Sequence, residues 1–188
     1  MATLVELNGV SPTIGDGVWL APTAVLIGDV RIGDRATVWY GAVLRADFDY
    51  IEVGAESSIQ DNAVLHCAEC VPTIVGSRVT VGHGALLEGC TIEDGALIGM
   101  GAIALHHVRV GAGAMLAAGT VAAERQTIRP GVLAAGVPAS EKKTLEGAAA
   151  RWTSFAADDY VRRRGQYLTN SLVVPAAGVA DERIYATS

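Results

Sequence analysis

Residues 91–128 read TIEDGALIGMGAIALHHVRVGAGAMLAAGTVAAERQTI, and an aliphatic residue or alanine returns at every sixth position of this stretch. These positions are Ile92, Ile98, Ala104, Val110, Leu116, Ala122 and Ile128. A period of six fits neither the 3.6-residue period of an α-helix nor the two-residue period of a strand buried on one face. It is typical of a parallel β-helix in which three hexads complete one coil.

The same frame extends in both directions, from Ile14 to Ala134, with small residues four places after most of the repeating positions. Small side chains there let each coil turn tightly around a narrow core. The spacing is interrupted by insertions after Leu44 and after Leu65, which predict loops near residues 47–52 and 67–73. Insertions of this kind often mark the functional face of a solenoid.

The composition agrees with a thin aliphatic core, because 51% of the 188 residues are hydrophobic while only 5% are aromatic. The net charge of −6, without a basic stripe, argues against a nucleic-acid partner. No signal peptide and no run of membrane-spanning length is evident, so we expect a soluble, cytoplasmic protein without a membrane partner. Three cysteines give no disulfide framework.

The chain divides into three segments by pattern. Residues 1–139 carry the β-helix repeat. Residues 140–170 are expected to form a C-terminal helical segment that covers one side or one end of the coils. Residues 171–188 form a weakly patterned tail that stays unassigned. The predicted fold class is therefore an all-β solenoid, a parallel β-helix of hexapeptide repeats with a C-terminal α-helix.

Polar residues fall at equivalent positions of successive coils. Residues three hexads apart lie one coil above each other, about 4.8 Å apart as neighbouring strands do. Arg45, His66 and Glu88 each follow an inward leucine on the same side of the prism, so they should form a vertical column, with Asp47 two places beyond Arg45.

His66 and Glu88 are close enough in this frame to share a metal ion, but zinc usually takes at least three protein ligands. Gln60 and His83 belong to the preceding side of the prism, near the same corner. His83 could converge with the other two only across a subunit interface. A threefold arrangement of prisms is the economical closed solution, so a homotrimer is expected.

Five motifs together resemble the γ-class carbonic anhydrases, over residues 10 to about 170. They are VLRADF (43–48), SIQDNAVLH (58–66), VTVGHGALLEGC (79–90), LIGMGAI (97–103) and GVPAS (136–140). The resemblance implies a left-handed β-helix and a trimer with a metal at each subunit interface. The left hand rests on the resemblance alone, since parallel crossovers are generally right-handed.

The resemblance also implies a set of metal ligands. His66 matches the first ligand of the family, and His83 matches the second, which comes from the neighbouring chain. Glu88 stands where family members have a third histidine. A divalent cation, zinc or alternatively iron, is thus expected on His66, His83 and Glu88, since two histidines and one glutamate form a known catalytic zinc set.

The remaining matches concern catalysis. Gln60 matches a glutamine that orients metal-bound solvent, and Asp61 and Asn62 match the segment lining the pocket floor. Arg45 and Asp47 match a pair that ties subunits together and borders the active site. Together with Glu88, the residues Gln60, Arg45 and Asp47 are the expected catalytic set.

The function implied is reversible hydration of CO2, a small-molecule substrate, by metal-bound hydroxide. Glu88 lowers the charge of the site relative to a third histidine, so this activity should be weak or shifted to alkaline pH. Three alternatives stay open: a metal-dependent hydrolase of a thioester or other carbonyl substrate, a metal-free trimeric assembly or binding subunit, and a hexapeptide acyltransferase. Glu88 could also mark a lost site by pairing with Arg45.

Two further features are weighed on the residues alone. His106, one coil above Glu88, could supply a compensating ligand. Cys67 and Cys70 form a CxxC directly after His66, which could be a redox pair or additional ligands, although no second CxxC accompanies it and chance placement in a loop explains it more simply.

Overall fold

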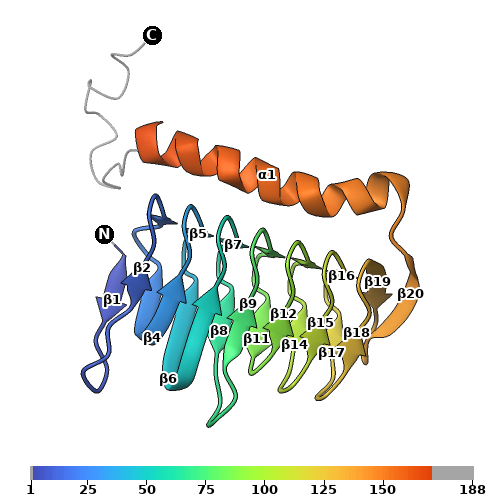
Figure 1. Ribbon diagram of the computed structural model, residues 1–188, viewed down its shortest axis with the longest axis horizontal. Coiled ribbons are helices and arrows are strands. Elements are labelled where there is room, and N and C mark those ends of the chain that lie inside the picture. The colour runs from blue at the N-terminus through green and yellow to red at the C-terminus, as the bar shows by residue number, and fades with distance from the viewer. Residues whose placement is uncertain (1, 171–188) are drawn as a thin grey trace, which may run out of the picture.

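The computed structural model describes residues 2–170, which form a three-sided parallel β-helix of about 7 turns with one helix lying along it (Figure 1). The fold class predicted from the sequence, an all-β solenoid with a C-terminal helix, is confirmed. Each coil contributes a short strand to each of three faces, and strands of successive coils pair in parallel.

Three faces are distinguished by their strands. Face 1 contains β1 (Thr3–Val5), β8 (Val64–His66), β11 (Leu86–Glu88), β14 (Ile103–Ala104) and β17 (Val121–Ala122). Face 2 contains β2 (Thr13–Ile14), β9 (Thr73–Val75), β12 (Thr91–Ile92), β15 (Arg109–Val110) and β18 (Thr127–Ile128). Face 3 contains β3 (Trp19–Leu20), β5 (Thr37–Val38), β7 (Ser58–Ile59), β10 (Thr80–Val81), β13 (Leu97–Ile98), β16 (Met115–Leu116) and β19 (Val132–Ala135). Two long strands, β4 (Val25–Ile32) and β6 (Val43–Val53), run around a corner and belong to both face 1 and face 2.

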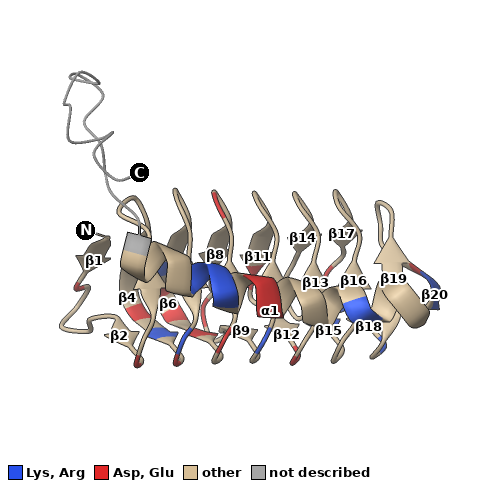
Figure 2. Ribbon diagram, turned by 90° about the horizontal axis from the view of Figure 1, so that it is seen from above, with Lys and Arg blue, Asp and Glu red and all other residues tan. Residues whose placement is uncertain are grey.

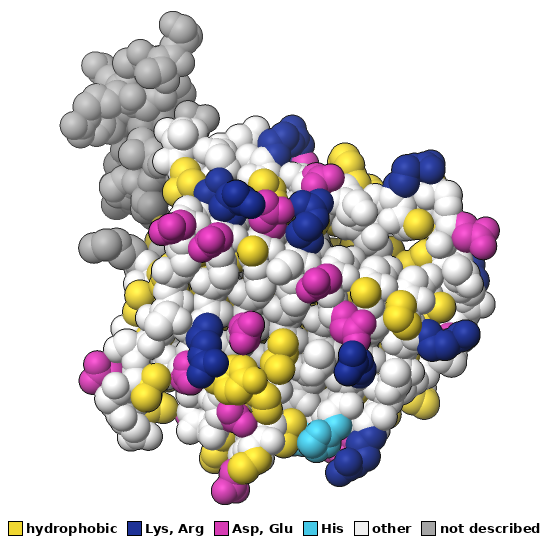
Figure 3. All heavy atoms as spheres, in the orientation of Figure 1, with side chains coloured by type: hydrophobic (Ala, Val, Ile, Leu, Met, Phe, Trp, Pro, Cys, Tyr) yellow, Lys and Arg dark blue, Asp and Glu magenta, His cyan; other side chains and the backbone are white. Residues whose placement is uncertain are grey.

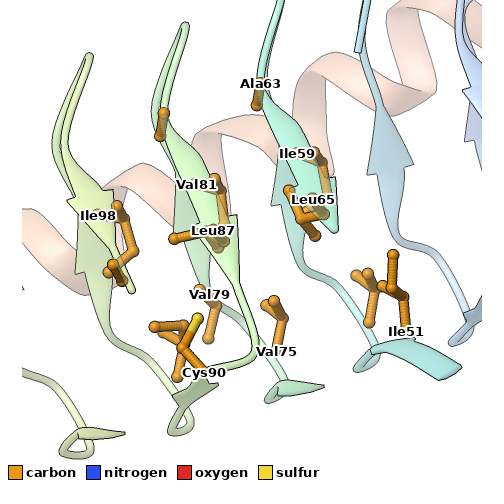
Figure 4. Packing of buried hydrophobic residues seen from close by; sticks show 14 of the residues in the cluster. Ile51, Ile59, Ala63, Leu65, Val75, Val79, Val81, Leu87, Cys90 and Ile98 are labelled. Atoms are coloured by element: carbon orange, nitrogen blue, oxygen red, sulfur yellow. The ribbon is translucent and has the colours of Figure 1, made fainter. Parts of the chain in front are cut away.

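The inward positions of the repeat form one continuous core. From Leu26 to Ala134 the residues of the hexad frame are buried, and the small residues four places later, such as Ala63 and Ala85, are buried with them. Figure 4 shows Ile59, Val81 and the neighbouring aliphatic side chains pointing into the prism. The first coil is the exception, because Ile14 at the end of the prism is exposed.

The register of the strands confirms the predicted column. Leu44 pairs with Leu65, and Leu65 pairs with Leu87, so the next residues, Arg45, His66 and Glu88, also pair in sequence. The hexad frame therefore predicted which side chains stand above one another on the outside of face 1.

The two insertions are accommodated differently. The loop predicted at 47–52 is wrong, because β6 continues without a break from face 1 to face 2 and pairs with β4 on both sides of a bulge. The inserted residues lie within the strand, but 47–50 have no partners in the register and form the bulge between the two paired parts of β6. Residues 67–72, between β8 and β9, do form a projecting loop (Figure 1).

The segment after the repeat differs from the expectation of helical structure from residue 140. Residues Ser140–Thr144 form β20, which pairs antiparallel with β19 and covers the otherwise open edge of the last coil. The helix α1 begins only at Gly147 and ends at Asn170. The sequence SEKKT has no apolar face that a helix could bury. Its backbone groups instead form hydrogen bonds with the edge strand β19. The unassigned tail 171–188 lies outside the described residues.

Helix α1 lies lengthwise over the coils (Figure 2). Its C-terminal half is anchored by aromatic contacts: the rings of Tyr160 and Tyr167 lie 5.3 and 4.8 Å from the ring of Trp39. An ion pair of 2.5 Å between Arg78 and Asp158 joins the helix to a corner of the prism.

Charged side chains of both signs are scattered over the face seen in Figure 3, without a continuous basic patch on that face. Among residues 2–170, no helix has the length and apolar character needed to cross a membrane.

Candidate metal centre

The centre of the polar column is the contact between His66 at the end of β8 and Glu88 at the end of β11. His66 Nδ1 lies 2.9 Å from Glu88 Oε1. The His66 side chain is 17% exposed and that of Glu88 is 41% exposed. The structure thus brings these two predicted ligands together on the outside of face 1, with the histidine the more enclosed of the two.

Asp47 and Arg45 extend the column downward. His66 Nε2 lies 2.9 Å from Asp47 Oδ1, and Asp47 is also paired with Arg45. Burial would raise the pKa of the Asp47 carboxyl, but hydrogen bonds with His66 and Arg45 outweigh it and hold the pKa below its ordinary value. Arg45 and Asp47 are paired within the chain, and their role in tying subunits together stays a prediction.

His106 extends the column upward. Its Nε2 atom lies 3.4 Å from Glu88 Oε1, the oxygen that also contacts His66. Burial would raise the pKa of the Glu88 carboxyl, but the contacts with His66 and His106 hold it below its ordinary value. Glu88 is therefore a carboxylate at neutral pH, and its pairing is with two histidines and not with Arg45.

The backbone around His66 and Glu88 is fixed by Thr73, the first residue of β9. The buried Thr73 hydroxyl donates to the carbonyl of His66 and accepts a 2.7 Å hydrogen bond from the amide of Gly89. Gly89 has a φ of 59°, and a Cβ atom on it would lie 2.8 Å from Cγ1 of Val71. Glycine at this turn, directly after Glu88, avoids displacing the Val71 side chain.

His83 is held separately, in the turn between face 3 and face 1. Its Nδ1 atom lies 2.9 Å from Oδ2 of Asp61, which occupies the equivalent turn one coil below. Its Nε2 atom has no partner among residues 2–170. A histidine oriented by a carboxylate on one nitrogen, with the other nitrogen free, is the usual arrangement of a metal-ligating histidine.

One chain alone does not complete a metal site. Within residues 2–170, no three His, Cys, Asp or Glu side chains gather closely enough to hold a metal ion. The donors nevertheless fit a divalent metal chemically, because His66 and Glu88 are neighbours on face 1 and His83 offers a free nitrogen at a different corner. The set is therefore divided between two surfaces of the same prism.

Gln60 lies apart from the polar column, beside a cavity of about 290 Å³ between face 3 and α1. His83 also lines this cavity. The aromatic residues that line it from the helix, Trp152, Phe155 and Tyr160, were not singled out in the sequence as functional. Their spacing of three to five residues was the available signal, but it is equally typical of a helix that simply packs on the prism.

Phe48 is a second residue that the sequence did not single out. Its ring lies edge-on to the His66 ring, with centroids 5.9 Å apart, and the side chain is exposed. Cys67 is buried and Cys70 is exposed, and both are free thiols. The backbone amide of Asp49 donates to Sγ of Cys67 over 3.2 Å, so this thiol contributes to packing behind the column.

Fold and site together define a hexapeptide-repeat β-helix protein that presents histidines and carboxylates on its outside. Residues 11–46 match the bacterial transferase hexapeptide family (six repeats). A crystal structure of a hexapeptide transferase family protein from Anaplasma phagocytophilum superimposes with a TM-score of 0.85 and 38% identity, covering 88% of this chain and 98% of that one.

Relatives found by sequence comparison indicate to which kind of hexapeptide-repeat protein the chain is similar. A carbonic anhydrase of Geobacillus kaustophilus is 35% identical over 85% of this chain and 87% of its own length. The mitochondrial gamma carbonic anhydrase 2 of Arabidopsis thaliana is 40% identical over 85% of this chain, which spans 59% of the length of that plant protein. The chain belongs to the γ-class carbonic anhydrase family.

Proposed function

We propose that this protein is a metal-dependent lyase that hydrates CO2 reversibly, working as a homotrimer with a metal centre between neighbouring chains. The observation that carries the proposal is the divided donor set: His66 and Glu88 are in contact on face 1, while His83 presents a free Nε2 from another corner of the same chain. A rotationally closed ring would bring face 1 of one chain against that corner of the next.

In this arrangement His66, Glu88 and a neighbouring chain's copy of His83 would hold a divalent cation, zinc or iron. The metal would supply Lewis acidity for the activation of water. His66 Nδ1 lies 2.9 Å from Glu88 Oε1, so a cation shared by these two side chains would take the place of this contact and of any proton that makes it. Metal binding should therefore weaken as the pH falls. The Asp47 carboxylate on Nε2 would hold the ring in orientation.

Other residues of the chain act around the centre. Gln60 offers an amide that can both donate and accept a hydrogen bond, which suits the orientation of a water molecule or of a polar substrate atom. Asp47, held by Arg45, can accept the proton that His66 gives up. Glu88 lowers the net charge of the ligand set by one relative to a third histidine, so hydration should be slow near neutral pH.

The cavity beside His83 favours a second candidate, a metal-dependent hydrolase of an organic carbonyl compound. CO2 has only three atoms, and a cavity of about 290 Å³ is far larger than it needs. The same donor set would serve both reactions, since polarising a carbonyl and activating water are both tasks of a Lewis acid.

Elemental analysis and stopped-flow CO2 hydration test the proposal, on the wild-type protein and on Glu88→His. Glu146→His is the matched control, because Glu146 is exposed between β20 and α1 and lies away from the column. We expect one divalent ion per chain in all three proteins, and faster hydration only in Glu88→His. Metal-free wild type beside metal-loaded Glu88→His would indicate a degenerate site and a binding or assembly role.

Sedimentation equilibrium tests the assembly independently. A trimer is expected, and a stable monomer at micromolar concentration would remove the shared centre altogether.

A further inference from the structure

The cavity between α1 and face 3 has two chemically distinct walls. The prism side is formed around the ends of β10 and β13 and includes Gln60, Thr80 and His83. The helix side is formed largely by apolar and aromatic groups, among them Trp152 and Phe155. An apolar wall with a few converging polar groups is the usual composition of a small-molecule site.

The position of the helix explains why this space is not filled. The C-terminal half of α1 is seated on the prism through Tyr160 and Tyr167 against Trp39. Nearer its N-terminal end, Trp152 and Phe155 stack on each other with centroids 5.4 Å apart, and each is more than half exposed. These two rings turn toward each other and the surface, so they do not fill the cavity.

The polar wall contains groups that lack partners. Gln60 is only 5% exposed, yet its side-chain amide makes no hydrogen bond with any residue between 2 and 170. The buried hydroxyl oxygen of Thr80 likewise has no partner within the described chain. Buried polar side chains are normally hydrogen-bonded, and leaving them unpaired carries a free-energy penalty. The Thr80 oxygen is enclosed, whereas the Gln60 amide lines the cavity and is accessible to a molecule that enters it.

The charges around the cavity are already neutralised. Asp159 is bound by Arg162 and Arg163, and His83 is bound by Asp61. Burial, and then the charge of Asp61, raises the pKa of the Tyr160 phenol, so this group stays protonated. No unpaired charge among the described lining residues is left to bind an ionic ligand, and an ion would lose its hydration without compensation.

We infer that this cavity binds an uncharged organic molecule with an aromatic or branched apolar body and one carbonyl or amide group. The body would lie against Trp152 and Phe155, and the polar group would pair with the Gln60 amide. A water molecule takes about 30 Å³ of the liquid, so 290 Å³ has room for roughly ten atoms of that size. The cavity adjoins the proposed metal centre through His83, but pairing of the ligand with the Gln60 amide needs no metal.

Fluorine NMR titration with 4-fluorobenzamide tests the inference, on the full-length protein before and after treatment with a chelator. We expect saturable binding with a Kd on the order of 1 mM in both states, as is typical of a ligand this small. The benzoate analogue, 4-fluorobenzoate, has nearly the same shape but carries a negative charge, and it should bind at least about tenfold more weakly. Binding by chelated protein separates this site from the metal centre.

Two variants locate the binding. Ala156→Leu places a larger side chain on the cavity wall and should weaken binding of the amide at least about tenfold. Gln166→Leu is the control, because Gln166 is exposed on the same helix outside the cavity, and it should bind as wild type does. Gln60→Leu keeps the volume and removes the amide, so it should also weaken binding, and it decides the question if Ala156→Leu does not fold by circular dichroism.

Three results would overturn the inference: no saturable binding of the amide to wild type, equal binding of amide and benzoate, or unchanged binding in both Gln60→Leu and a folded Ala156→Leu.

Discussion

Face 1 and the corner between faces 3 and 1 each carry part of the proposed metal-ligand set, and the side chains are held differently on the two surfaces. On face 1, His66 and Glu88 contact each other, and Asp47 and His106 occupy further positions around them. At the corner, Asp61 is the one side-chain partner of His83 among residues 2–170, and it leaves the Nε2 atom of His83 free. On face 1 the polar side chains are already paired with one another. At the corner, the His83 ring is oriented, but its Nε2 atom is unpaired within the described residues.

The difference has a simple origin in the repeat. Both pairs are separated by 22 residues along the chain, one coil with its insertion, so the same spacing makes both contacts. On face 1 the column of Arg45, His66, Glu88 and His106 continues through four coils, and its polar atoms find partners within the chain. At the corner, the stack of polar side chains consists of Asp61 and His83. A metal centre that combines the two surfaces therefore requires a second chain.

The largest expected effect comes from separating the two surfaces. His66→Ala and His83→Ala should each abolish stoichiometric metal binding, with hydration falling at least about a hundredfold. When the two variants are mixed by co-expression, about a quarter of the sites in randomly assembled trimers should pair an intact His66 with an intact His83. Metal content and hydration should recover in that proportion. No recovery, with mixed trimers confirmed by mass spectrometry, would place each site within a single chain.

The next effect concerns the core shared by both surfaces. Leu65 is fully buried next to His66, while the preceding Val64 points outward and is exposed. Leu65→Ala should lower the free energy of unfolding by about 2–5 kcal/mol, and Val64→Ala by less than about 0.5 kcal/mol. Chemical denaturation measures both. Similar losses for the two variants would contradict the alternation of inward and outward positions.

A smaller effect is expected from a substitution on face 1, where the polar side chains are paired with one another. Glu88→His should raise CO2 hydration near pH 7 on the order of tenfold, equivalent to about one pKa unit in the acidity that the metal confers. Because Glu88 lies outside the core, the melting temperature should change little. Unchanged or slower hydration with metal bound would refute the charge argument and favour an organic carbonyl substrate.

The smallest effect is expected at the corner between faces 2 and 3, where Glu56 lies between β6 and β7, away from both surfaces. Hydrogen bonds from Arg78, and then from Arg35, hold the pKa of Glu56 below its ordinary 4.5. A lowered folded-state pKa stabilises the protein above the unfolded pKa, and this contribution disappears as the pH falls through the folded value. Glu56→Gln should therefore cost no more than about 1 kcal/mol at pH 7, and the difference from wild type should vanish well below pH 4.5. Thermal unfolding at both pH values measures it, and a pH-independent difference would exclude the ion pairs as its cause.

The sequence predicted the fold in detail where one rule applied at every position. The hexad frame placed Leu44, Leu65 and Leu87 in the core and thereby put Arg45, His66 and Glu88 in one column, as the register confirms. The frame fails where residues depart from it. An insertion can either project, as at 67–72, or lengthen a strand, as in β6, and the choice depends on pairing partners in the coils on each side.

Other features of the site depend on side-chain contacts that the repeat does not encode. The attachment of His106 to Glu88 follows from the column, but the contact of Asp47 with His66 Nε2 depends on the course of β6 around the corner. The cavity beside Gln60 depends on where α1 comes to rest, which is set by Trp39 and the tyrosines of the helix. Metal occupancy and subunit arrangement stay predictions.

The course of α1 has a consequence for biosynthesis. Coils of a solenoid contact mainly their neighbours and can stack one by one as they leave the ribosome. Helix α1 is translated after all of them, and Tyr167 near its end reaches back to Trp19 in β3. The helix that connects late coils to early ones is therefore synthesised after every coil. A chain that stops before α1 could stack its coils but would lack the contacts that α1 makes along the length of the prism.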